Sequence, residues 1–105
     1  MPGFPDELAH CTGFEWNAGN RDKSWGRHGV AQGEAEQIFF NRPVLVAADP
    51  EHSQGEPRYA ALGQTSEGRL LAVVFTIRGT LIRVISARNM SRRERRRYEQ
   101  KEEAG

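Results

Sequence analysis

Apolar and polar positions alternate along residues 58–89, RYAALGQTSEGRLLAVVFTIRGTLIRVISARN, in three runs rich in β-branched and aliphatic residues. Alternation with a period of two is typical of strands that bury one face. Glu67-Gly68 and Arg78-Gly79 separate the runs, and each is a two-residue loop ending in glycine, the commonest hairpin connection. The pattern therefore predicts an antiparallel meander.

The predicted loops decide which side chains share a face of the meander, because directly opposed residues of an antiparallel pair point to the same side. With two-residue loops, Thr76 lies opposite Tyr59 and Arg83 lies opposite Val74. We expect one face to form the core, with Ala60, Leu62, Leu71, Val73, Phe75, Ile77, Ile82 and Val84. The open face then carries Tyr59, Ala61, Gly63, Thr65, Leu70, Ala72, Val74, Thr76, Leu81, Arg83 and Ile85.

The first half of the chain predicts helices and short strands. A strand at 14–16 precedes a helix that Asn17 caps and that ends before Gly29. The next helix, in AQGEAEQIFFN, carries one apolar stripe, and VLVAA after it is a short strand. The expected fold class is α+β: two N-terminal helices packed on an antiparallel sheet with a three-strand meander, plus a C-terminal basic helix. We expect residues 14–105 to form this single domain and residues 1–13 to form a mobile leader.

The C-terminal helix is predicted from its capping signal. Ser91 is followed three residues later by Glu94, which is the spacing of a capping box. Tyr98 is the only residue of the helix with a substantial apolar surface, so we expect a solvated arm or a docking surface. At 100° per residue, an arc of about 140° holds Arg92, Arg93, Arg96 and Arg97.

Length, composition and charge narrow the class of protein. A chain of 105 residues has room for one core, and no apolar run reaches the roughly 18 residues of a membrane span, so we expect a cytoplasmic protein without membrane contact. The single Cys11 can form neither an internal disulfide nor a cysteine metal site. The formal charge is −5 over residues 1–57 and +6 over residues 58–105. This asymmetry indicates either a polyanionic partner for the second half or neutralisation within the fold.

An ordered set of segments carries a family resemblance: FEW and RHGV, AEQIFF, DPEHSQGEPRY, TIRGTLIRVISAR and SRRERRRYE. With them the chain resembles the BrnT toxins, of the RelE/ParE-type toxin superfamily. The resemblance implies a ribonuclease toxin that arrests translation and is neutralised by a BrnA-like antitoxin, with operator DNA bound only through the antitoxin complex. It also implies the compact fold described above. One departure is Asn20, which stands where the family usually has a lysine.

The open face is the predicted site of RNA cleavage. A metal-free ribonuclease needs cations at the phosphate, an acceptor for the 2′-OH proton and a donor for the leaving oxygen. Arg83 is expected to bind the phosphate, or else to form a structural ion pair, while Thr76 and Tyr59 orient the substrate or stack a base. His28 is part of the family motif, and histidine is a residue type suited to acid–base work, although it also suits the end of a helix.

Further phosphate contacts are expected around this face, and no metal or cofactor is expected. A one-residue bulge would exchange the two faces of the meander and expose Arg58, Ser86 and Arg88 instead. The remaining predicted RNA-binding residues lie on the C-terminal helix: Arg92, Arg93, Arg96 and Arg97.

Two other functions remain open at this point. One is a non-catalytic binding module that works only in an antitoxin–repressor complex, which the missing lysine at position 20 favours. The other is a gyrase poison, because the superfamily that the chain resembles includes toxins with a protein target.

Overall fold

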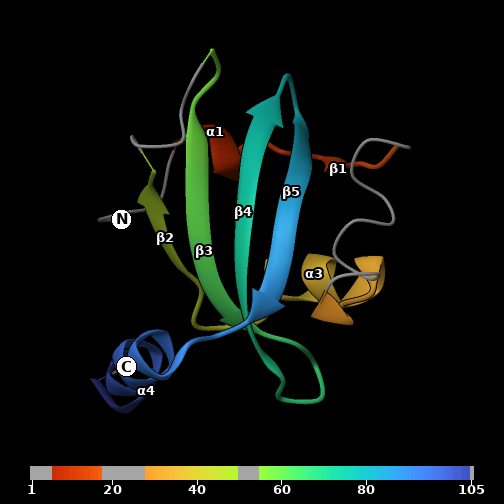
Figure 1. Cartoon of the computed structure of the whole chain (residues 1–105). Coiled ribbons are helices and arrows are strands. Elements are labelled where there is room, and N and C mark those ends of the chain that lie inside the picture. Colours follow the sequence, from red (N-terminus) through yellow and green to blue (C-terminus); the bar gives the residue numbers. More distant parts are fainter. Residues whose placement is uncertain (1–5, 18–27, 50–54, 105) are drawn as a thin grey trace.

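The computed structural model describes residues 6–17, 28–49 and 55–104 of the chain. Its helices are α1 (Asp6–Ala9), α3 (Gln32–Gln37) and α4 (Arg92–Ala104), and its strands are β1 (Gly13–Glu15), β2 (Leu45–Ala48), β3 (Arg58–Gln64), β4 (Leu70–Arg78) and β5 (Leu81–Asn89). The strands form one five-stranded sheet in the order β1-β5-β4-β3-β2, shown in Figure 1.

The expected fold class is wrong in two respects. The sheet is mixed rather than antiparallel, because β1 pairs in parallel with β5. Among the described residues, no two N-terminal helices pack on the sheet: before β2 stand only α1, of four residues, and α3, of six. The direction of β1 follows from a pairing between distant parts of the chain, for which the sequence carries no local signal. Most of the helix predicted after Asn17 falls in residues 18–27, outside the described residues.

The hydrophobic core lies on one face of the sheet. Phe75 and Leu71 of β4 are fully buried there together with Ile38, which follows α3. Ile38 lies so close to β3 that a Cβ atom on Gly63 would be 2.8 Å from the Ile38 Cβ, so this approach requires glycine. Leu8 of α1 belongs to the same core; whether residues 1–13 are mobile stays a prediction.

The register between β3 and β4 differs by one residue from the predicted one. The loop has three residues, 66–68, because the Thr65 N–H donates to the Arg69 carbonyl at 2.9 Å, and Gly68 has a φ of 88°. A shift of one residue turns every side chain of a strand to the other face. Therefore Arg58, rather than Tyr59, lies opposite Thr76, and the faces predicted for β3 were wrong.

The hairpin of β4 and β5 keeps the predicted faces near its turn and exchanges them further on. Its loop is Gly79-Thr80, and the resulting shift of two residues leaves Thr76 and Arg83 on the open face. Past Val84 the register shifts by one residue, with Ile85 as the extra residue. This bulge corresponds to the alternative left open by the sequence, and it turns Ser86 and Arg88 toward the open face.

Helix α4 is anchored by one aromatic residue. It packs against β3, at the end of the sheet where β3 finishes (Figure 1). Tyr98 has no exposed surface, and its hydroxyl donates to the Pro43 carbonyl at 2.6 Å. Between residues 92 and 101, whose side chains are described, Tyr98 is the only buried one. The alternatives of a solvated arm or a docking surface did not include this anchor.

Candidate functional site

Four residues from four strands lie in one row across the open face. Thr76 of β4 pairs with Arg58 of β3 on one side and with Arg83 of β5 on the other, and Arg83 pairs with Glu15 of β1. Neighbouring strands are about 4.8 Å apart, so the backbones of Arg58 and Arg83 are about 10 Å apart. The row therefore brings two guanidinium groups and a carboxylate to one surface, at the end of the sheet away from α4.

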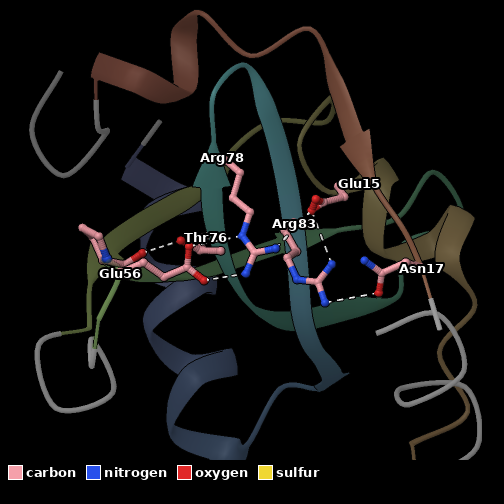
Figure 2. Close-up of polar contacts among 7 residues, drawn as sticks. Glu15, Asn17, Glu56, Thr76, Arg78 and Arg83 are labelled. Atoms are coloured by element: carbon pink, nitrogen blue, oxygen red, sulfur yellow. Dashed lines mark hydrogen bonds and ion pairs between the residues drawn. The ribbon is translucent and has the colours of Figure 1, made fainter. Parts of the chain in front are cut away.

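Arg83 is held from the β1 side of the row. Its Nη1 lies 3.4 Å from the Oε2 of Glu15, and its Nη2 donates to the Oδ1 of Asn17 at 3.3 Å (Figure 2). Only 15% of the Arg83 side chain is exposed. The structural ion pair considered as an alternative for Arg83 is thus present, with a carboxylate from outside the meander.

Two further charged residues, Arg78 and Glu56, border the row and were not predicted from the sequence. Arg78 donates from Nη2 and Nε to the two carboxylate oxygens of Glu56, at 2.9 and 3.2 Å. These hydrogen bonds lower the pKa of Glu56 from its ordinary value. Arg78 Nη1 also lies 3.4 Å from the same Glu15 oxygen that Arg83 contacts. Glu15 was not predicted either, although a signal for it was available: it lies between the two apolar residues of the strand expected at 14–16, so its side chain points away from the core.

Thr76 has a positional role in the row. It is 1% exposed, and its hydroxyl donates to the carbonyl of Pro57 at 2.6 Å. This hydrogen bond fixes the residue directly before Arg58. Tyr59, predicted to work with Thr76, instead faces the core, where its ring stacks on Phe75 with centroids 5.5 Å apart. The structure therefore does not bring Tyr59 to the open face.

Arg88 and the start of α4 form a second polar cluster. Arg88 donates through Nη1 and Nη2 to the two oxygens of Glu94, at 2.7 and 2.9 Å. The predicted capping box is confirmed, because the Ser91 N–H donates to Glu94 and the Glu94 N–H donates to the Ser91 hydroxyl. Hydrogen bonds from Arg88, followed by that from Ser91, lower the pKa of Glu94 to about 2. Arg88 thus joins β5 to α4.

This depressed pKa predicts how acid affects stability. A carboxyl with a lowered pKa in the folded state stabilises the fold above its unfolded pKa of 4.5 and loses that contribution as the pH falls through about 2. We expect the free energy of unfolding of wild type to exceed that of Glu94→Gln by about 1–2 kcal/mol at pH 7, after allowance for solvent screening. This difference is expected to disappear as the pH falls from 4.5 to about 2. Urea denaturation over a pH series measures the difference. A difference in unfolding free energy that stays constant down to pH 2 contradicts this prediction. The control is Glu99→Gln, which changes a carboxylate on the exposed surface of α4.

The arginines of α4 lie apart from the row. Arg92, Arg93, Arg96 and Arg97 are all exposed, and so is Arg95, which was not among the predicted RNA-binding residues. At about 3.3 Å per residue, β5 carries the chain about 20 Å from Arg83 to Asn89, where α4 follows. These arginines therefore form a separate basic surface, the α4 surface.

His28 is not brought into the row. Its side chain is exposed, and it precedes Gly29, whose carbonyl accepts a hydrogen bond from Arg69 Nη1 at 3.0 Å. Arg69 also donates to both carboxylate oxygens of Glu34 in α3. Because Arg69 stands just before β4 and Thr76 lies near the other end of that strand, this network holds the His28 backbone at the opposite end of the sheet.

No group of three or more His, Cys, Asp and Glu side chains in residues 6–17, 28–49 and 55–104 is placed to hold a metal ion. In the same part of the chain, no helix has the length and apolar character needed to cross a membrane.

Comparison with known proteins assigns the family. Residues 16–94 match the sequence model of a family described as "Ribonuclease toxin, BrnT, of type II toxin-antitoxin system". No curated protein matches the chain. The matched region covers about three quarters of the chain and includes Arg58, Thr76 and Arg83 of the row. The chain therefore belongs to the BrnT family of ribonuclease toxins of type II toxin–antitoxin systems.

Proposed function

We propose that the protein is a metal-independent endoribonuclease that inhibits translation by cutting RNA at the row of Arg58, Thr76 and Arg83. The observation that supports this proposal is the register that aligns two arginines across three strands on one face. The attacking group is the 2′-OH of the RNA itself, which displaces the 5′ oxygen from the adjacent phosphate and leaves a cyclic phosphate. Donors fixed in advance around the phosphate stabilise the charge that develops in this step.

Each member of the row has a distinct task. Arg83, held by Glu15 and Asn17, presents its remaining N–H donors to the phosphate with little freedom to move. Arg58 binds the same phosphate from the other side of Thr76. Thr76 acts as a positioning residue, because its hydrogen bond to the Pro57 carbonyl fixes the start of β3 and hence the origin of the Arg58 side chain.

The proposal is tested with purified protein, freed of antitoxin, and a 5′-labelled RNA in buffer containing EDTA. We expect cleavage products with 2′,3′-cyclic phosphate and 5′-hydroxyl ends. Cleavage that EDTA abolishes would show a metal-dependent reaction instead. RNA binding without cleavage would show a non-catalytic module, or an activity that needs the ribosome, and repeating the assay with ribosomes added separates these two outcomes.

The partner antitoxin is also part of the proposal. Membership of a type II toxin–antitoxin family implies an antitoxin partner and an RNA target. We infer that the antitoxin is BrnA-like and that the complex binds operator DNA through it. In a mobility-shift assay with the operon's own promoter, the complex is expected to retard the DNA, whereas the toxin alone is not.

The α4 surface is proposed to track the RNA backbone outside the cleavage site. Replacing Arg92, Arg93, Arg96 and Arg97 with glutamine is expected to reduce the slope of log affinity against log salt by about 3, since each contact to a single-strand phosphate contributes about 0.7. The cleavage rate at saturating RNA is expected to stay unchanged, because the α4 surface is remote from the row. Fluorescence anisotropy between 50 and 200 mM salt, with a non-cleavable 2′-deoxy-substituted RNA, measures the slope.

The matched control keeps the charge of the α4 surface. Lysine at the same four positions is expected to retain the slope, because the contact to a phosphate is mainly one of charge. An unchanged slope in the glutamine variant contradicts the proposed RNA contact and leaves the α4 surface as a candidate contact for the antitoxin.

A further inference from the structure

Glu15 is the carboxylate in the row of residues across the open face. It ends the row next to Arg83, and its Oε2 atom lies 3.4 Å from the Nη1 atoms of both Arg78 and Arg83. Figure 2 shows its carboxylate directed from β1 toward these two guanidinium groups. A quarter of the Glu15 side chain remains exposed. It is therefore a carboxylate that a bound RNA can reach.

The position of Glu15 is determined by the residues on either side of it. Phe14 points to the core, where its ring packs against Phe39 with centroids 5.7 Å apart. Trp16 donates from its indole Nε1 to a carboxylate oxygen of Glu36 at 2.7 Å. Because side chains alternate along a strand, these contacts on the core side direct Glu15 to the open face. The carboxylate is thus held in place by the backbone of β1.

The ion pairs of Glu15 are longer than those of three other carboxylates, Glu34, Glu56 and Glu94. Charge-assisted N–H···O bonds are usually about 2.7–2.9 Å long. Glu15 lies at 3.4 Å from each of its two arginines. In three other ion pairs, the arginine nitrogen lies 2.7–3.0 Å from the carboxylate of Glu34, Glu56 or Glu94. Among these four carboxylates, Glu15 is thus the one whose paired arginines lie furthest from it.

We propose that Glu15 is the general base of RNA cleavage, an inference that rests on the ribonuclease function proposed above. A phosphate oxygen bound by Arg83 at about 2.8 Å lies beside Glu15, so the 2′-OH of the same nucleotide comes within reach of the carboxylate. The 2′-OH gives its proton to Glu15, the 2′ oxygen bonds to phosphorus, and the bond from phosphorus to the 5′ oxygen breaks. The 5′ oxygen takes a proton from water, and Glu15 then releases its proton to the solvent.

The test compares Glu15→Gln with Glu56→Gln, since both residues are carboxylates that pair with Arg78. Glu15→Gln is expected to cleave about 10²–10⁴-fold more slowly, while binding of a 2′-deoxy-substituted RNA stays within about fivefold of wild type. Glu56→Gln is expected to stay within about fivefold in both measurements. Added formate is expected to restore part of the activity of Glu15→Ala, because it supplies a carboxylate to the vacated space.

The outcomes separate this inference from the proposed function. Cleavage by Glu15→Gln at nearly the wild-type rate overturns the inference alone and leaves Glu15 as an ion-pair partner of Arg83. Absence of cleavage by wild type, with and without ribosomes, overturns the proposed function and the inference together. Circular dichroism establishes that the variants fold. Should Glu15→Gln unfold, Glu15→Asp keeps the charge and withdraws the carboxylate by one methylene, and an undiminished rate for it overturns the inference.

Discussion

Replacing Arg83 with alanine is expected to slow RNA cleavage by about 10²–10³-fold, the loss found when a donor that stabilises transition-state charge is removed. The reason is that Arg83 lies at the centre of the charged row, with only 15% of its side chain exposed and two contacts that hold its guanidinium group. Single-turnover cleavage of labelled RNA at saturating protein measures the chemical step apart from binding.

Two further variants show whether this loss is specific. Arg83→Lys keeps the charge but not the planar fork of donors, so we expect it to recover only part of the rate. Arg42→Ala removes an exposed arginine outside the sheet and is expected to leave the rate unchanged. A wild-type rate for Arg83→Ala, in protein that melts as wild type does, would exclude the row as the cleavage site.

Replacing Tyr98 with alanine is expected to lower the free energy of unfolding by about 3–5 kcal/mol, the usual range when a large aromatic side chain is removed from a core. Tyr98 is fully buried and is the one buried side chain in the described part of α4 up to residue 101. Because small domains are stable by about 5–15 kcal/mol, this loss is large enough to detach α4 or to unfold the chain. Urea denaturation followed by circular dichroism measures it.

The phenylalanine variant separates the two contributions of Tyr98. Tyr98→Phe removes only the hydrogen bond to the Pro43 carbonyl and is expected to cost about 1 kcal/mol. Wild-type stability in Tyr98→Ala would show that α4 is not held by this side chain. The α4 surface would then have no fixed position relative to the row. The proposed path of the RNA requires such a fixed position.

Much of the local structure was predictable because short-range chemistry determines it. Glycine after a strand-like run marked both hairpins, and the capping box of Ser91 and Glu94 marked the start of α4. The apolar stripe before Asn41 predicted a helix in the segment where α3 lies. Arg83 and Thr76 were assigned to the correct face of the sheet even though the predicted register was wrong by two residues, because a shift of two residues does not exchange the faces.

The candidate site could be predicted only in part, because a single extra residue in a loop or bulge decides to which face of the sheet the side chains of a strand point. A loop of three residues instead of two exchanged Tyr59 for Arg58 in the row. One extra residue, Ile85, turned Arg88 toward the open face, where Glu94 binds it. Such differences change the hydrophobic pattern little, so that pattern alone does not distinguish them.

What the sequence by itself determined is therefore the antiparallel meander, the short strands before it, the basic C-terminal helix and the family. Only the tertiary structure decided which charged groups meet. Glu15 and Arg83 are 68 residues apart in the chain and come together because β1 pairs in parallel with β5. Tyr98 is buried because α4 packs against β3 and its hydroxyl reaches Pro43. Contacts of this kind depend on the packing of distant segments, which no local pattern of residues specifies.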